Sequence, residues 1–178
     1  MIDRLMVILP PSQLRRCTTP TISRYRSNRE ITLNAPAFVI QKIEAIITAA
    51  MDSGRNKILI DTNLKLGLPM ENIDKIAGPF VEAWAYEVFR ETIEDKENTY
   101  DLLNVEAGER LNFADVILQF RRRRKRSESV TGYIDVKATS EDIKSSGKSP
   151  NITSFVRIRT EYVKNPDLIF IILSIKHS

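Results

Sequence analysis

Two short segments decide the fold: Asn112-Phe113-Ala114-Asp115-Val116-Ile117-Leu118 and, twenty residues after Asp115, Ile134-Asp135-Val136-Lys137. Each is a short run of apolar, largely β-branched or aromatic residues interrupted by charge, a pattern that favours buried strands. We predict strands over 113–120 and 130–138, joined as a hairpin by the Arg-rich stretch 121–126. Such a hairpin brings Asp115 beside Asp135.

The charges of the second strand lie on one face. Strand side chains alternate, so Asp135 and Lys137 point to the same side and Val136 to the other. Charges on an apolar strand are unfavourable unless they are paired or bound to a metal. Asp115 and Asp135 repel each other at close range, and Mg²⁺, a hard cation that takes oxygen ligands, relieves that repulsion.

This set of side chains suits phosphodiester hydrolysis. The cation polarises a phosphate oxygen and promotes a hydroxide from bound water, while Lys137 neutralises growing charge or positions the water. A structural alternative stays open at this point. Asp115 and Lys137 could form an ion pair, or these residues could lie at strand ends in solvent.

The rest of the chain predicts an α/β fold, with a small mixed sheet flanked by helices. The expected elements are an edge strand within 5–9, helices over 37–51, 80–93 and about 152–163, and a buried strand over 168–175.

Composition limits the class of protein. Lys and Arg outnumber Asp and Glu by 27 to 23, which favours a polyanionic partner. Cys17 has no partner for a disulfide, and the longest apolar run, 168–175, is about half of a membrane span, so we expect a cytoplasmic protein without membrane contact. The single histidine, His177, lies next to the C-terminus, which argues against histidine-based nuclease chemistry, and no Gly-rich phosphate loop indicates a nucleotide cofactor.

The two segments resemble the PD-(D/E)xK motif of type II restriction endonucleases, with Asn112-Phe113-Ala114 in place of the nominal proline. Asp135-Val136-Lys137 with Ser-Pro-Asn-Ile-Thr-Ser at 149–154 is similar to blunt-cutting enzymes of the HincII kind, and the helix around Pro79-Phe80, with Glu82 and Tyr86, extends the likeness. The resemblance covers roughly 78–175. We therefore expect one domain, with 1–77 as an N-terminal arm and helical region and 78–178 as the catalytic core.

The resemblance implies roles for individual residues. Asp115 and Asp135 would be metal-binding carboxylates, the Val136 carbonyl a further ligand and Lys137 the catalytic lysine. Glu82 would be a helix carboxylate facing the site, although a solvent-exposed helix glutamate is the commoner case. The family further implies a Mg²⁺-dependent homodimer that cuts both strands of a short palindromic site in double-stranded DNA, leaving 5′-phosphate and 3′-hydroxyl ends. Likeness to one small enzyme of this kind implies blunt ends and a tetranucleotide made only of C and G.

Several polar residues are candidates for DNA contact. The loop that follows the catalytic strand would lie against the duplex, and the Arg-rich stretch would attract phosphates, although both could be ordinary solvated surface. Met51, at a helix end, could wedge between base steps or pack in the core. The candidates are Arg121, Arg122, Arg123, Arg124, Ser140, Lys144, Ser146, Lys148, Asn151 and Met51.

Two other functions remain open. In a non-catalytic nucleic-acid-binding module the Arg-rich hairpin would do the binding, but such a module gains nothing from two carboxylates beside its basic surface. A junction-resolving or repair nuclease could use the same centre, and a panel of DNA substrates would separate it from a restriction enzyme.

Overall fold

The computed structural model describes residues 2–8, 35–59, 63, 65, 73–109, 112–122, 128–140 and 155–177. The strands are β1 (Ile2–Ile8), β2 (Leu102–Ala107), β3 (Val116–Arg121), β4 (Ser129–Ser140) and β5 (Ile169–His177). The helices are α2 (Ala35–Ala50), which continues into a π-helical turn at Met51–Arg55, α3 (Ile73–Glu94) and α4 (Phe155–Lys164). Among the described helices, none is long and apolar enough to cross a membrane.

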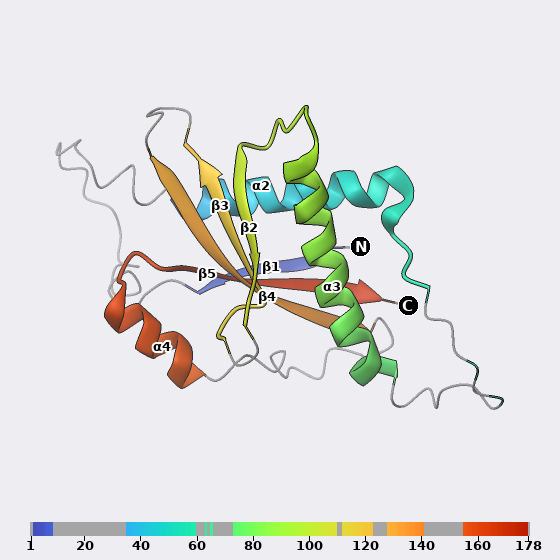
Figure 1. The fold of residues 1–178 in the computed structure, drawn as a ribbon. Helices are drawn as coiled ribbons and strands as arrows, with labels where there is room; N and C mark the ends of the chain where they lie inside the picture. The colour runs from blue at the N-terminus through green and yellow to red at the C-terminus, as the bar shows by residue number, and fades with distance from the viewer. Residues whose placement is uncertain are drawn as a thin grey trace, which may run out of the picture.

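The strands form one mixed sheet in the order β1-β5-β4-β3-β2. β2, β3 and β4 are successive antiparallel neighbours, β4 and β5 run parallel, and β1 closes the far edge antiparallel to β5. The expected mixed sheet, its β3–β4 hairpin and its N-terminal edge strand are therefore confirmed. Figure 1 shows α2 and α3 together, with α4 set apart from both.

Each face of the sheet has its own apolar cluster, because side chains alternate along the inner strands. Ile134 and Val136 of β4 pack in the larger cluster with α2 and α3. Tyr133 of β4 packs in the smaller one, where α4 contributes Ile158 and Tyr162. Helices on both faces leave polar groups of the sheet few places to reach solvent, so a charged residue on an inner strand must lie near a strand end or a gap in the cover.

The segmentation differs from the sequence expectation in three places. β2 was not predicted, because its buried residues, Leu102 and Val105, do not alternate with exposed ones, as the register shifts between Leu102 and Asn104. α3 begins at Ile73, seven residues before the expected start, so Pro79 lies inside the helix, where its missing N–H removes one hydrogen bond of the helix backbone. β3 begins at Val116, so Asp115 lies immediately before the strand and not within it.

The end of α2 is tied to α3 around Arg55. Gly54 leaves the helix with φ of 90°, a conformation that suits glycine. The Arg55 carbonyl then accepts a hydrogen bond from Trp84 Nε1 at 2.8 Å. The Arg55 guanidinium contacts Glu87 and Glu91. These contacts fix the helix that carries Glu82.

Candidate active site

Asp115 is held in place through its backbone and its side chain. Its N–H donates to the Ile134 carbonyl at 2.8 Å, and its own carbonyl accepts from the Gly108 N–H at 2.7 Å. The carboxylate Oδ2 accepts a hydrogen bond from the Val136 N–H at 2.7 Å. Two backbone bonds therefore fix Asp115 just before β3, and one bond from β4 orients its carboxylate.

Gly108 is needed for this arrangement, and sequence reasoning missed it. A Cβ built on Gly108 would lie 1.9 Å from the Ala114 carbonyl oxygen, far inside any contact that real Cβ atoms make. The backbones of 108 and 114–115 can approach only because residue 108 lacks a side chain. The available signal was a glycine six residues before an otherwise apolar Ala-Asp-Val segment.

Asp135 and Lys137 project from the same face of β4 as predicted. Asp135 is fully buried, and its Oδ1 accepts a hydrogen bond from Lys137 Nζ at 2.6 Å. The Lys137 side chain keeps 22% of its exposure, so the ammonium lies at the boundary between the buried carboxylate and solvent. The ion pair that the sequence left open is therefore made with Asp135, not with Asp115.

Glu82 joins this group from α3. Burial raises the pKa of the Glu82 carboxyl, the positive charge of Lys137 lowers it and the negative charge of Asp135 raises it. A fully exposed helix glutamate would not couple to those two residues, because water screens such interactions. The fold thus brings all four side chains that the sequence singled out for chemistry into one electrostatic neighbourhood.

The electrostatics of Asp115 reflect that neighbourhood. Burial raises its pKa to about 6, well above the usual range of an aspartate. The Val136 N–H and Lys137 lower the pKa, whereas the negative charges of Glu82 and Asp135 raise it further. Perturbed carboxyls with a specific set of partners mark functional sites more often than structural ones.

The donor set fits a divalent cation held by few protein ligands. Within the described part of the chain, no group of three or more His, Cys, Asp or Glu side chains is placed to hold a metal ion. Mg²⁺ commonly uses one or two carboxylates and keeps several waters, which Asp115 and Asp135 can satisfy. The Val136 N–H bonds Asp115, and the carbonyl of a strand residue points to the same neighbour as its N–H, so the Val136 carbonyl would offer a third oxygen.

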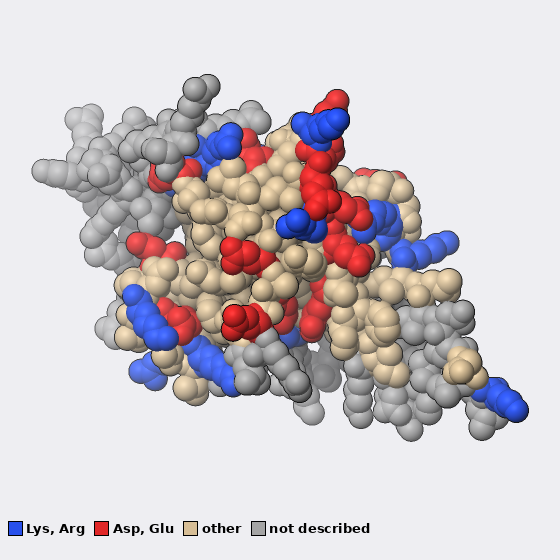
Figure 2. Space-filling view, in the orientation of Figure 1, with Lys and Arg blue, Asp and Glu red and all other residues tan. Residues whose placement is uncertain are grey.

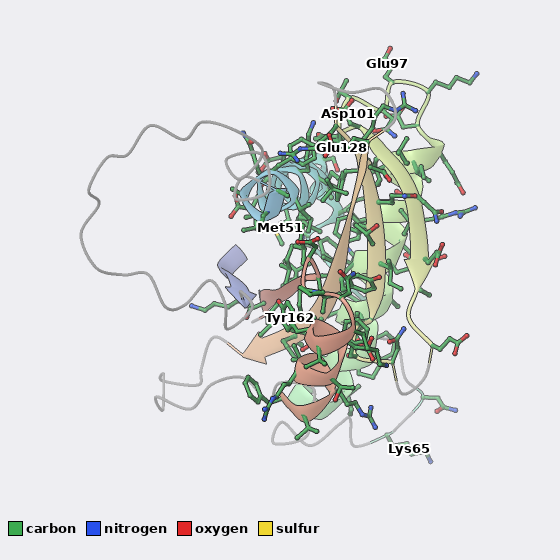
Figure 3. The ribbon with its side chains drawn as sticks, turned by 90° about the vertical axis from the view of Figure 1, so that its left-hand side faces the viewer. Met51, Lys65, Glu97, Asp101, Glu128 and Tyr162 are labelled. Atoms are coloured by element: carbon green, nitrogen blue, oxygen red, sulfur yellow. The ribbon has the colours of Figure 1, made fainter. Side chains whose placement is uncertain are left out.

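Arg121 and Arg122, the two residues of the Arg-rich stretch that the structure describes, lie at the other end of the hairpin. Arg121 is exposed at the end of β3, six residues from Asp115, which is about 20 Å along a strand. Arg122 Nη1 lies 3.6 Å from Glu128 Oε1, and the two residues also share a backbone hydrogen bond. Figure 3 places Glu128 and Asp101 together at this end of the sheet.

Other DNA-contact candidates lie outside the described residues. These are Arg123, Arg124, Lys144, Ser146, Lys148 and Asn151, together with the side chain of Ser140. Met51 is described, and its partly buried side chain packs against the larger apolar cluster. This packing favours the core alternative for Met51 over a wedge between base steps.

Charge is unevenly distributed over the surface. Figure 2 shows acidic side chains gathered over α3 and β2. The exposed acidic residues of these two elements include Glu87 and Glu91 of α3 and Glu106 of β2. A surface of this sign repels a polyanion.

The mixed sheet flanked by helices on both faces defines a protein with an α/β, restriction-endonuclease-like fold. A family model described as "Type II restriction endonuclease HpaI" matches residues 26–178. The "Type II restriction enzyme HpaI" of Haemophilus parainfluenzae is 59% identical over 140 residues. The chain belongs to the HpaI family of type II restriction endonucleases.

The match to the Haemophilus parainfluenzae enzyme covers only part of that protein. The aligned part makes up 79% of this chain and 54% of the Haemophilus parainfluenzae relative, so the chain spans about half the length of the protein it matches. No solved structure matches. The narrower likenesses, to HincII and to the small enzyme ThaI with its site of C and G only, gain no support from these comparisons.

Proposed function

We propose that the protein is a Mg²⁺-dependent type II site-specific deoxyribonuclease that hydrolyses both strands of double-stranded DNA at a short palindromic site. The observation that carries this proposal is the coupled group of Asp115, Asp135, Lys137 and Glu82 in a chain of the HpaI family. A structural ion pair explains Asp135 and Lys137, but it gives no reason to bury a second carboxylate beside the first.

The roles follow from position and charge. Asp115, Asp135 and the Val136 carbonyl would hold Mg²⁺, which supplies a polarised phosphate oxygen and an acidified water when bound. Lys137 stands at the rim of the site, where its ammonium can donate to a phosphate oxygen and offset the charge that develops there. Glu82, with its raised pKa, is suited to accept a proton from water.

The products would carry 5′-phosphate and 3′-hydroxyl ends, and the cut would be blunt. A homodimer accounts for cleavage of both strands, because a two-fold protein presents one site to each strand of a palindrome. The loop that follows β4, with Ser140, Lys144, Ser146, Lys148 and Asn151, would contact the duplex beside the cut. Arg121 to Arg124 would contact phosphates farther along it.

Digestion of plasmid DNA with and without Mg²⁺ tests the proposal. We expect discrete fragments from the wild type with Mg²⁺, and none from Asp135→Ala or Lys137→Ala. Lys164→Ala is the matched control, because Lys164 is an exposed lysine that pairs with Glu161 on α4. Sequencing the fragment ends gives the site and the cut geometry, and sedimentation analysis with and without duplex gives the oligomeric state.

Each failure has a distinct meaning. A wild type that binds duplex yet leaves it intact with Mg²⁺ or Mn²⁺ would refute the nuclease and support the binding-module alternative. Cleavage confined to branched or damaged substrates would replace the restriction enzyme by a junction-resolving or repair nuclease.

A further inference from the structure

The C-terminal end of β5 carries a polar strip next to the candidate active site. β5 is an inner strand, with β1 on one side and β4 on the other. On the face toward α2 and α3 it stays apolar to its end, through Ile171, Leu173 and Ile175. On the opposite face, Phe170 and Ile172 are buried, but the next two residues of that row are Ser174 and Lys176, both half-buried.

The change from apolar to polar residues in β5 occurs beside Asp135 and Lys137 of β4. In the parallel ladder of β4 and β5, Asp135 pairs with Ile172 and Lys137 pairs with Ser174. Thr139 pairs with Lys176, one row further on. Registered residues of adjacent strands project from the same face about 5 Å apart, so Ser174 and Lys176 stand on the face that carries Asp135 and Lys137.

These two residues break the apolar pattern of an inner strand. An inner strand covered on both faces is expected to be apolar throughout, as the row through Ile171, Leu173 and Ile175 is. A lysine at the open end of such a strand raises the positive potential beside two carboxylates that would hold a cation. In open α/β sheets, ligands bind beyond the carboxyl ends of the parallel strands, and β4 and β5 are the parallel pair.

We propose that Ser174 and Lys176 bind a backbone phosphate of the DNA that neighbours the phosphate at the cut. Lys176 would bind it through its ammonium and Ser174 through its hydroxyl. The inference rests on the proposed nuclease function and extends the substrate surface from β4 onto β5. With Lys137, the two residues form a row of donors that follows one strand of the duplex away from the metal-binding carboxylates.

The salt dependence of DNA binding tests the assignment without any cleavage. Affinity for a labelled random-sequence duplex is measured in Mg²⁺-free buffer over a range of salt concentrations. Lys176→Gln, which keeps most of the aliphatic stem, should bind about tenfold more weakly, and its salt slope should fall by about 0.9, the value for one lost phosphate contact. Ser174→Ala should bind more weakly with an unchanged slope, because a neutral hydroxyl releases no counterion.

Two controls separate a phosphate contact from a structural role. Lys176→Arg should keep the slope of the wild type, since the charge is retained. Lys164→Gln removes the same charge from the exposed surface of α4 and should leave the slope unchanged. In cleavage assays the Lys176→Gln defect should appear mainly in KM, whereas a distorted active site would lower kcat.

The outcomes distinguish a failure of the β5 contact from a failure of the proposed nuclease function. If the wild type cuts DNA and Lys176→Gln binds with the wild-type salt slope, the β5 contact is refuted and the nuclease stands. If the wild type neither binds nor cuts DNA, the proposed function fails and the β5 contact fails with it. A Lys176→Gln variant that unfolds at a lower Tm but keeps the wild-type slope would also refute the contact.

Discussion

The two ends of the β3–β4 hairpin carry charge in opposite ways. At the open end, which carries Asp115 and Asp135, the charges are few, but they are buried and act on one another. Asp135 is inaccessible to solvent, and burial raises the pKa of Asp115 to about 6. At the other end, the described charges are exposed or paired near the surface: Arg121 is exposed, and Arg122 pairs with Glu128. Charge density in the sequence is highest at the turn, but burial and mutual coupling distinguish the open end. A site for chemistry is thus located better by desolvated charge than by abundant charge.

The largest effect is expected from neutralising Asp115 at the open end. Asp115→Asn should lower the cleavage rate by about a thousandfold or more, because a metal-binding carboxylate is lost. The same change should raise Tm by a few degrees at pH 8 in metal-free buffer, since it removes a buried charge that Glu82 and Asp135 disfavour. Thermal unfolding and plasmid cleavage measure the two effects.

The control for this variant is Glu109→Gln, an exposed acid close to Asp115 in sequence. It should change neither Tm nor cleavage appreciably. If Asp115→Asn cut DNA at the wild-type rate, the contrast between the two hairpin ends would lose its functional meaning.

A smaller effect is expected from disturbing the backbone that positions Asp115. Gly108→Ala must push the Ala114 carbonyl aside, which should destabilise the fold by about 1–3 kcal/mol and lower cleavage by about a hundredfold, since a shift of about 1 Å suffices for that. Gly78→Ala is the matched control, because a Cβ there meets nothing within 4 Å. Equal activity of the two variants would show that the close approach of the strands does not set the carboxylate.

The pH dependence should follow the raised pKa of Asp115. Cation binding needs the ionised carboxylate, so cleavage should fall about tenfold per pH unit below about 6. Higher Mg²⁺ should move the midpoint to lower pH, because the cation favours the ionised form. A midpoint independent of Mg²⁺ concentration would dissociate Asp115 from metal binding.

Stability of the metal-free protein should change in the opposite direction. The folded-state pKa of Asp115 lies above that of the unfolded chain, so the folded state binds more protons between about pH 4 and pH 6. This residue's contribution to stability therefore declines as pH rises through that window. Asp115→Asn should remove this decline in urea titrations at successive pH values.

The smallest effect is expected at the turn. Arg122→Gln should cost about 0–1 kcal/mol, as is usual for a surface ion pair, and should change kcat less than about threefold. Any loss of DNA affinity should diminish at high salt. A hundredfold loss of kcat from Arg122→Gln would reverse the comparison and place the turn in the reacting centre.

The sequence predicted the chemistry-bearing residues better than their supports. Period-two alternation placed Asp135 and Lys137 on one face because a strand allows no other arrangement. It could not anticipate Gly108, since the need for glycine arises from contact with Ala114 across a turn. Nor could it assign the lysine's partner, because the choice between Asp115 and Asp135 depends on where β3 begins.

The amino-acid order by itself determined the mixed α/β class, the central hairpin and the residue types for metal-assisted phosphate chemistry, because these follow from local periodicity. Only the tertiary structure decided that Glu82 couples to the site from α3, that Asp115 bonds the Val136 N–H, and that Ser174 lies beside Lys137. The register of a parallel pair joins residues far apart in the chain, and burial depends on what covers each face. Local pattern fixes neither quantity.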